Sequence, residues 1–131
     1  GRDAQARMSA SAVFVSGLRG VGVEIAKNLA LMGVKSITIH DDEPAEWGDL
    51  SANFYLTEAD VGKPRSASCA PRLAELNQYV PITVHTGSAV DAIASGSFAV
   101  AVVNDAALDS QLELDAACRA AGTAFISTAN R

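Results

Sequence analysis

The sequence has few aromatic residues and less positive than negative charge. Aromatic side chains make up 5% of the 131 residues, and 10 Lys and Arg face 15 Asp and Glu, for a formal net charge of −5. Neutralising the phosphates of a nucleic acid needs clustered Lys and Arg. We therefore expect no nucleic-acid partner.

Long apolar runs and abundant cysteine are also missing. The sequence contains no run of about 18 apolar residues, which a membrane-spanning helix needs, and residues 1–4 lack the apolar character of a signal peptide. We therefore expect no membrane association. Cys69 and Cys118 are too few for a disulfide framework or a zinc site. We expect two reduced, intracellular thiols packed in helices.

The apolar residues, 49% of the chain, follow alternating strand and helix patterns. The predicted strands are 13–16, 36–40, 82–86, 98–103 and 123–127, and the predicted helices are 21–32, 64–77 and 110–122. This order predicts an α/β fold, a Rossmann-like and mainly parallel sheet with helices on both faces. We expect it to be a partial domain.

The predicted helix 21–32 has an apolar stripe. Its members recur at helical spacing and are Val21, Ile25, Leu29 and Met32. Lys27 and Asn28 belong to the wetter side, and Gly33 is placed for a left-handed C-terminal cap.

Other helix ends are marked by caps and by proline. The spacing of Thr57 with Asp60, and of Ser110 with Glu113, predicts two capping boxes. Pro71 falls inside the predicted helix 64–77 and lacks a backbone N–H, so it predicts a kink or a late start.

A glycine-rich segment, GLRGVG at 17–22, joins the first strand to the first helix. Such a turn suits phosphate binding, because the N–H groups and dipole of the helix start favour an anion. Asp41 ends the second strand, where a carboxylate can accept from a ribose hydroxyl. However, Arg19 takes the place of the second glycine in G-x-G-x-x-G, and Gly20 comes one position late.

We interpret this loop as a vestigial nucleotide site formed by Gly17, Arg19, Gly20, Gly22 and Asp41. Its glycines then serve a tight strand-to-helix turn and close packing. Weak phosphate binding aided by Arg19, and an interdomain role for Arg19, remain alternatives.

Three longer segments are more specific than the loop. They are SAVFVSGLRGVGVEIAKNLALMGVKSITIHD, LSANFYLTEADVGKPRS and PRLAELNQYVPITVHTG, in this order. They resemble the first segment of eukaryotic ubiquitin-activating enzymes, which are ThiF-like, over about residues 7–130. That family has two related adenylation-type halves. The active half uses ATP and magnesium to adenylate the ubiquitin C-terminus, and a separate domain then carries ubiquitin as a thioester.

The resemblance implies that residues 1–131 are the first part of the inactive half, in a larger multidomain ligase of the cytoplasm and nucleus. The implied partners are the active half of the same polypeptide, ubiquitin and ubiquitin-conjugating enzymes. ATP and magnesium are implied for the parent enzyme, and no cofactor or metal for this fragment.

Residue by residue, the resemblance implies lost catalytic groups. An active half has an Asn-Arg-Gln trio before a Phe, and the positions here, counted back from Phe54, are Ser51, Ala52 and Asn53. Ala52 therefore replaces an arginine of the type that grips phosphate.

Two further family positions are altered. A lysine of the next segment corresponds to Arg65, with Lys63 beside it. The family's magnesium-binding aspartate falls near Ala106, and Asp105 and Asp109 flank that place. We expect these two aspartates to belong to a helix cap and a solvated loop, and we expect no catalytic residue in this chain.

Several other residues have structural interpretations. His40 and His85, each at a strand end, are expected to be satisfied structural histidines. Trp47, with Phe54 and Tyr55, is expected to pin its loop, or alternatively to contact the partner half.

Other functions remain open at this stage. The nearest is the equivalent half of an enzyme that activates a ubiquitin-like modifier. An active adenylating domain with altered residues and a nicotinamide-dependent oxidoreductase are the others. Because half of a paired core exposes an apolar face, we also expect weak self-association or marginal stability.

Overall fold

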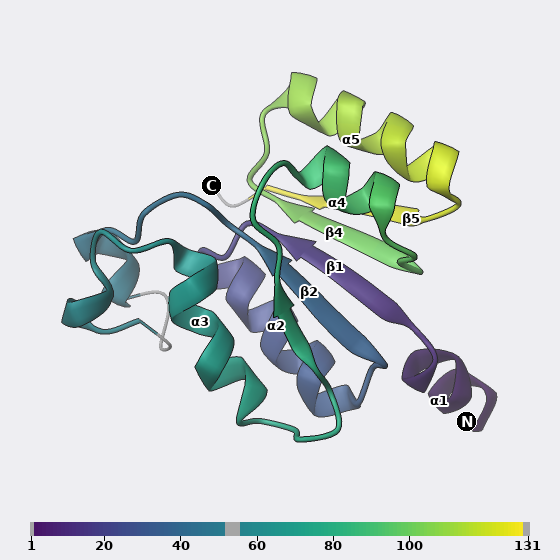
Figure 1. Cartoon of the computed structure of the whole chain (residues 1–131), viewed down its shortest axis with the longest axis horizontal. Helices are drawn as coiled ribbons and strands as arrows, with labels where there is room; N and C mark the ends of the chain where they lie inside the picture. Colours follow the sequence, from purple (N-terminus) through teal and green to yellow (C-terminus); the bar gives the residue numbers. More distant parts are fainter. Residues whose placement is uncertain (1, 52–55, 130–131) are drawn as a thin grey trace.

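The computed structural model describes residues 2–51 and 56–129. A five-stranded, all-parallel sheet with the order β3-β2-β1-β4-β5 forms its centre (Figure 1). The strands are β1 (Ala12–Ser16), β2 (Ser36–His40), β3 (Ile82–Val84), β4 (Val100–Asn104) and β5 (Ala124–Thr128). The predicted Rossmann-like α/β fold is confirmed.

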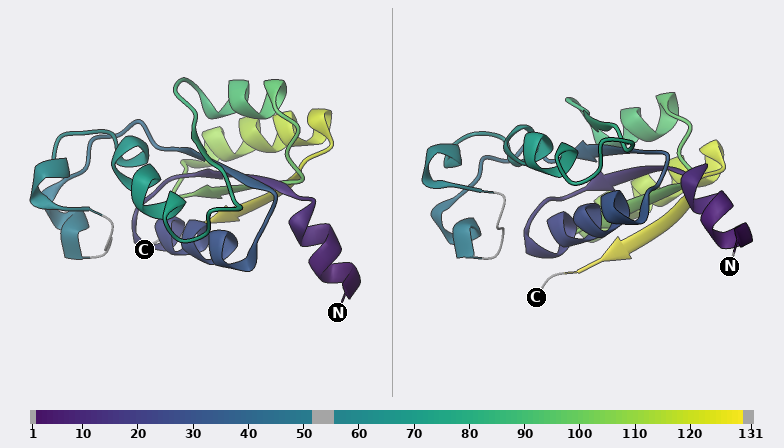
Figure 2. Two further views of the ribbon diagram at one scale, coloured as in Figure 1. Left: turned by 60° about the horizontal axis from the view of Figure 1, so that its bottom comes forward. Right: turned by 90° about the horizontal axis from the view of Figure 1, so that it is seen from below.

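Helices lie on both faces of the sheet. They are α1 (Arg2–Ser9), α2 (Gly20–Met32), α3 (Arg65–Ala74), α4 (Ala89–Ser95) and α5 (Leu108–Ala121), with short 3₁₀ helices η1 (Trp47–Ser51) and η2 (Glu58–Asp60). α2 and α3 pack on one face, and α4 and α5 pack on the other (Figure 2). Among the helices of the described chain, none has the length and apolar character to cross a membrane.

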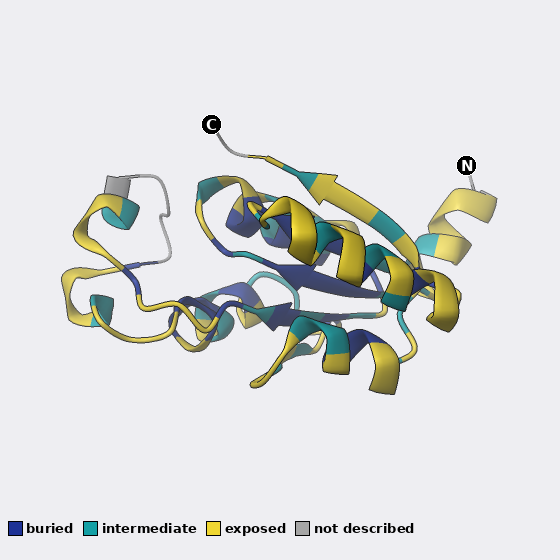
Figure 3. Ribbon diagram, turned by 90° about the horizontal axis from the view of Figure 1, so that it is seen from above, coloured by how far each residue is buried: buried dark blue, intermediate teal, exposed yellow. Residues whose placement is uncertain are grey.

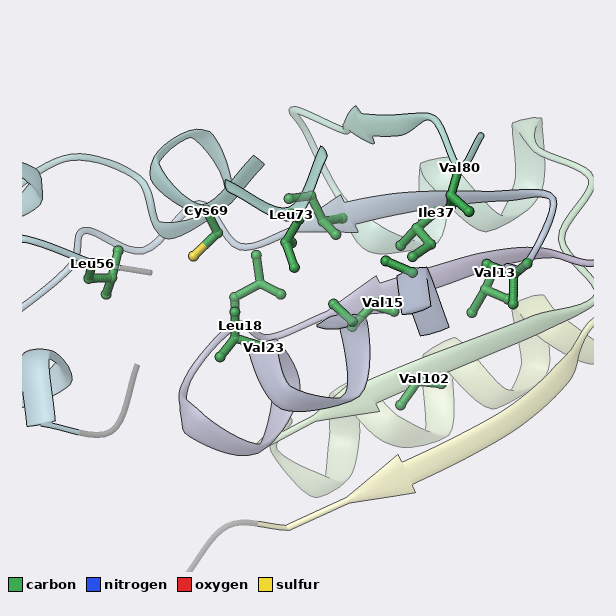
Figure 4. Packing of buried hydrophobic residues seen from close by; sticks show 14 of the residues in the cluster. Val13, Val15, Leu18, Val23, Ile37, Leu56, Cys69, Leu73, Val80 and Val102 are labelled. Carbon is green, nitrogen blue, oxygen red and sulfur yellow. The ribbon is translucent and has the colours of Figure 1, made fainter. Parts of the chain in front are cut away.

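Each face of the sheet has its own apolar core. Val15 and Ile37 point toward α2 and α3, where they meet Leu73 (Figure 4). Phe14 and Val103 point the opposite way, toward α4 and α5. Because successive residues of a strand face opposite sides, the central strands must be apolar throughout, as the sequence is.

The central strand β1 pairs with β2 on one side and with β4 on the other. The chain therefore reverses its direction of travel across the sheet at this strand. In open parallel sheets a ligand crevice forms at such a point, beyond the carboxyl ends of the strands. Ser16 and His40 are paired there, at the ends of β1 and β2.

The prediction that strands 82–86 and 98–103 follow each other directly was wrong. α4 lies between them, and Ser88 caps it by accepting a hydrogen bond from the Asp91 N–H at 3.1 Å. Parallel strands need a crossover connection, and this short helix provides it. α1 was also not predicted, because it is short and mostly exposed.

The buried face of α2 coincides only in part with its apolar stripe, of which Ile25 and Leu29 pack partly buried against the core. The buried residues are Gly22, Val23, Ala26 and Ala30, while Val21 and Met32 of the stripe are 40% and 52% exposed. Small side chains allow the helix to lie close to the sheet. Figure 3 shows that the exposed surface lies mainly on the helices and on β5.

The predicted helix ends were partly right. Gly33 and Gly122 are left-handed C-caps with φ of 79° and 71°. The capping box of Thr57 and Asp60 is confirmed, with the Thr57 N–H donating to Asp60 Oδ2 at 2.8 Å.

Two helix starts were wrong. α5 begins at Leu108, before the predicted start at Ser110, and the Ser110 N–H donates to Asp109 Oδ1 rather than entering a box with Glu113. α3 begins at Arg65 and contains Pro71, so the late start was wrong. The alternative kink stays a prediction.

Candidate functional site

A cleft of about 490 Å³ opens at the carboxyl ends of β1, β2 and β4. Its lining includes Gly17, Arg19, Asp41, Arg65 and Ala106. The fold thus brings together one end of the glycine loop, the predicted ribose-type carboxylate, and two altered family positions, Arg65 and Ala106.

The glycines of the loop are required by packing. Gly17 has φ of 86°, and a Cβ there would lie 2.5 Å from the Asn104 carbonyl oxygen. A Cβ on Gly22 would lie 1.8 Å from the Gly17 carbonyl oxygen. Gly20 is the first residue of α2. These contacts support the interpretation of a tight turn between strand and helix.

Arg19 stands at the start of α2, beside the cleft. It is the N-cap residue, with extended backbone. Its side chain is 49% exposed, and its Nη2 lies 3.7 Å from Glu43 Oε2. A large cationic side chain therefore occupies the mouth of the cleft, where a second glycine would leave room for phosphate.

Asp41 is 7% exposed and already holds two backbone donors. Its Oδ2 accepts from the Leu18 N–H at 2.8 Å, and its Oδ1 accepts from the Glu43 N–H at 3.1 Å. The carboxylate therefore ties the glycine loop to the segment after β2.

Arg65 is buried at the cleft among three carboxylates. Its side chain is 1% exposed; Nε donates to Asp49 Oδ2 at 2.9 Å and Nη1 donates to Glu43 Oε2 at 3.2 Å. Nη1 also lies 3.6 Å from Asp41 Oδ1. Burial alone would lower the pKa of the guanidinium, but the hydrogen bond to Asp49 and the charges of Asp41 and Asp49 outweigh it and raise that pKa.

Two aspartates, Asp105 and Asp109, flank the place to which the resemblance assigns the family's magnesium ligand. Asp105 lines the cleft with a left-handed backbone (φ 59°), and its N–H donates to the Thr128 carbonyl. Asp109 bonds the Ser110 N–H at the start of α5. Ala106, near which the resemblance puts the family's aspartate, offers a methyl group, and its carbonyl accepts from Gln111 Nε2 at 2.7 Å.

His40 and His85 both make hydrogen bonds at the end of the sheet. His40 Nε2 lies 2.8 Å from the Gly87 carbonyl, which only accepts, so the proton is assigned to Nε2 and Ser16 donates to Nδ1 at 2.8 Å. His85 Nε2 donates likewise to the Ser88 carbonyl at 3.0 Å. Both are satisfied structural histidines, as predicted.

Sequence analysis missed Asn104 and Asp49. The Asn104 amide donates to the carbonyls of Ser16 and Gly17 at 3.0 and 3.1 Å, and accepts from Thr128 at 2.5 Å. Its position directly after a buried apolar strand was the available signal. Asp49 lies in a polar loop, where nothing in the sequence separates it from its neighbours.

The cysteines are buried thiols, Cys69 in α3 and Cys118 in α5. Burial, and then the charge of Asp115, raise the pKa of the Cys118 thiol. That thiol is therefore a poor nucleophile, which fits the prediction of a helix-packed cysteine.

Part of the predicted site lies outside the described residues. These positions are Ala52, Asn53, Phe54 and Tyr55. Trp47 begins η1 and is 65% exposed; its predicted cluster with Phe54 and Tyr55 therefore stays a prediction.

Comparison with known proteins places the chain in a family. The profile of the ThiF family matches residues 1–130. The chain belongs to the ThiF family. Its cleft therefore lies in a fold that other ThiF-family members also use.

Curated relatives are ubiquitin-pathway enzymes by name. Ubiquitin-like modifier-activating enzyme 1 of Oryctolagus cuniculus and that of Homo sapiens are each 49% identical over 126 residues, 96% of this chain. Human ubiquitin-like modifier-activating enzyme 7 is 40% identical over the whole chain. The chain spans 12–13% of the length of these relatives.

Solved structures share the ThiF-type fold at low identity. The E. coli tRNA N6-threonylcarbamoyladenosine dehydratase TcdA in complex with AMP superimposes with a TM-score of 0.80 at 22% identity, over 95% of this chain and 53% of that one. E. coli MccB superimposes with a TM-score of 0.84 at 20% identity, over 95% of this chain and 39% of that one.

Proposed function

We propose that this ThiF-family chain is a non-catalytic adenylation half-domain of a ubiquitin-activating enzyme. The observation that carries the proposal is the setting of Arg65, which corresponds to a lysine of the active half. Its guanidinium is 1% exposed and faces Asp41, Glu43 and Asp49. A cation with three carboxylates around it has little attraction left for a triphosphate.

The residues present do not fit ATP with magnesium. The Asp41 carboxylate is occupied by two backbone N–H groups. Arg19 fills the place of the glycine that would let backbone approach the phosphates. Ala106 has no oxygen side chain for a hard cation, which prefers oxygen ligands. On this proposal, no adenylation takes place at this cleft.

The role that remains is structural support within a larger enzyme. The parent, in this proposal, is an ATP- and magnesium-dependent ligase that adenylates ubiquitin, forms a thioester and passes ubiquitin to conjugating enzymes in the cytoplasm and nucleus. This half pairs with the active half of the same polypeptide. The 49% identity to ubiquitin-like modifier-activating enzyme 1 supports that assignment.

Isothermal titration of the chain with Mg-ATP tests the proposal. We expect no resolvable binding at millimolar nucleotide, and no pyrophosphate exchange when ubiquitin is added. Tight one-to-one binding, or exchange above the protein-free rate, would show an active adenylating domain and contradict the proposal. An intact fold in the same buffer, measured by circular dichroism, is the control.

An equivalent half of an enzyme for a ubiquitin-like modifier is the second candidate. The 40% identity to ubiquitin-like modifier-activating enzyme 7 over the whole chain supports this candidate. A competition between ubiquitin and related modifiers separates the two candidate functions. The modifier that the parent polypeptide takes up as a thioester identifies which of them is right. ThiF membership favours adenylation-type ancestry over the nicotinamide alternative.

A further inference from the structure

His40 and His85 lie beside each other where β2 and β3 end. Their ring centroids are 6.0 Å apart, and they are the two histidines of the 131 residues. The proposed function uses neither of them. Histidine is the side chain that ordinarily changes its charge between about pH 5 and pH 8. A pair of histidines is therefore a place where a modest change of pH alters the local charge.

The two imidazoles hold consecutive carbonyl groups of one short segment. His40 Nε2 donates to the Gly87 carbonyl at 2.8 Å, and His85 Nε2 donates to the Ser88 carbonyl at 3.0 Å. Gly87 has φ of 107°, a conformation that favours glycine, and a Cβ added there would lie 3.6 Å from His85 Nε2. Residues 85–88 therefore follow a tight path around the histidine pair.

Ser88 connects the histidine pair to α4. Its side chain accepts from the Asp91 N–H at 3.1 Å, and its carbonyl also accepts from the Ala92 N–H at 3.2 Å. Ala89, the first residue of α4, lines the cleft. The start of α4, and with it part of the cleft lining, is therefore held in place by the imidazole N–H groups.

Asp42 offers the His40 ring a second acceptor. Its Oδ2 lies 3.4 Å from His40 Nε2, the nitrogen that donates to the Gly87 carbonyl at 2.8 Å. A hydrogen bond between ionised groups is about twice as strong as one between neutral groups. Protonation of His40 therefore favours the carboxylate over the carbonyl as the acceptor for the same N–H group.

A charge on His40 also acts on His85 and on Ser16. Two imidazolium rings at this separation repel each other. A protonated Nδ1 no longer accepts from the Ser16 hydroxyl, which lies 2.8 Å away. The side chain of His40 is 16% exposed, whereas His85 is half-buried and residues 86–88 are exposed. The repulsion therefore moves the 85–88 segment rather than β2.

The other ionisable groups around the histidine pair belong to the cleft and to α4. Arg19 is paired with Glu43, and Arg65 is paired with Asp41. Two further carboxylates are those of Asp105, in the cleft lining, and Asp91, in the first turn of α4. Because both arginines are engaged by other carboxylates, Asp42 is placed to take the N–H of His40.

We propose that the histidine pair and Asp42 form a pH-sensitive device that holds the start of α4. With neutral imidazoles, His40 and His85 bond the carbonyls of residues 87 and 88. With both imidazoles charged, His40 Nε2–H bonds Asp42 instead, the His85 ring turns away, and the first turn of α4 loosens. The inference does not depend on the proposed function, because it involves no nucleotide.

Hydrogen exchange of the whole chain at about pH 7.5 and about pH 5.5, on either side of the ordinary histidine titration, tests the device. The amides of Asp91 and Ala92 report on it, because both donate to Ser88. After correction for intrinsic rates, we expect them to exchange about tenfold faster at the lower pH. The Gly33 amide, in the cap of α2, is the internal reference. Equal protection at both pH values overturns the proposal.

Three substitutions separate the device from a general effect of pH. His85→Gln keeps an N–H donor but removes one charge, and Asp42→Asn removes the competing carboxylate. Each should abolish most of the change in exchange rate. Asp3→Asn, in the exposed part of α1, alters the net charge as Asp42→Asn does and should keep the whole change. An unaltered response in His85→Gln or Asp42→Asn, or its loss in Asp3→Asn, contradicts the proposal.

Nitrogen NMR of the imidazoles gives a readout on the native chain, which needs no variant to fold. At about pH 8, both rings should carry their proton on Nε2, as the two carbonyl contacts require. At about pH 5.5, both rings should be doubly protonated while the first turn of α4 loses protection. A neutral His40 with its proton on Nδ1, or a pair that stays neutral while α4 loosens, overturns the proposal.

Discussion

At the scale of single residues, side chains in the cleft are engaged with one another rather than directed toward a ligand. Asp41 bonds two backbone N–H groups, and Arg65 is held by Asp41, Glu43 and Asp49. In such a cluster the charge of the guanidinium and the charges of the carboxylates offset one another.

Replacing Arg65 tests that cluster. Arg65→Met keeps most of the volume but leaves Asp41 and Asp49, 7% and 12% exposed, without their cation. We expect a loss of about 3 kcal/mol in the free energy of unfolding, measured by urea denaturation. Arg65→Lys should lose less, because it keeps the charge. Equal stability of all three proteins would mean that the cluster contributes nothing.

Gly22 is expected to be intolerant of any side chain. Gly22→Ala puts a Cβ 1.8 Å from the Gly17 carbonyl oxygen, and we expect it to destabilise the fold by about 3 kcal/mol. Helix propensity alone predicts the opposite sign, a gain of about 1 kcal/mol. Thermal unfolding decides between them, with Asn28→Ala on the exposed side of α2 as the control. A more stable Gly22→Ala variant would refute the packing explanation.

At the scale of elements, helix faces and helix ends are set by different forces. The small residues of α2 form its buried face toward the sheet, since Ala26 and Ala30 are fully buried. The ends of η2 and α2 are set locally, by the Thr57–Asp60 box and by Gly33.

Two substitutions in α2 separate the buried face from the apolar stripe. Ala26→Leu should cost about 1–3 kcal/mol, because the helix has no room against the sheet. Met32→Lys, at a position 52% exposed, should change stability by about 0.5 kcal/mol or less. Urea midpoints of both variants give the comparison, and the reverse order would mean that the stripe is the buried face.

The Thr57–Asp60 box predicts a pH dependence. The hydrogen bond from the Thr57 N–H, the largest cause, and those from Thr57 Oγ1 and Arg72 lower the pKa of Asp60 against an opposing effect of burial. A lowered pKa in the folded state stabilises the fold above the ordinary value near 3.8, and this stabilisation is lost as pH falls through the folded value.

Asp60→Ala should therefore cost about 1 kcal/mol at pH 7, and the difference from the native chain should shrink as the pH approaches 3. Urea unfolding at a series of pH values measures this. Glu58→Ala, in the same short helix, is the control. A difference that stays constant with pH would rule out the carboxylate as its cause.

At the scale of the whole molecule, Asn104 joins parts of the chain that are distant in sequence. Its amide connects the end of β1, residues 16–17, with β4 and β5. Ser16, Gly17 and Asn104 line the cleft, and these contacts exist only when the parallel sheet is assembled.

Asn104→Asp tests this junction. A carboxylate cannot donate to the carbonyls of Ser16 and Gly17, so we expect a loss of about 2–3 kcal/mol in stability. Cooperative thermal unfolding followed by circular dichroism measures it. Asn77→Asp, which removes one donor to the Ala30 carbonyl, should cost less. An Asn104→Asp variant as stable as the native chain would contradict this role.

Much of the fold was predictable because its signals are local. The apolar runs of the five strands, the glycine caps at 33 and 122, and the Thr57–Asp60 box depend on neighbouring residues, and all were confirmed. The short α4 was missed because seven residues give too little periodicity. The stripe of α2 was half right: Ile25 and Leu29 pack against the core but Val21 and Met32 are exposed, because apolar spacing does not say which face the sheet covers.

The sequence by itself determined the strand–loop–helix order, the damaged glycine pattern and membership of the family. Only the tertiary structure decided that Arg65, Asp41 and Asp49 share one cluster, and that Asn104 supports the glycine loop. The physical reason is distance along the chain. These contacts join residues separated by tens of positions, so they form only when the strands take their order in the sheet.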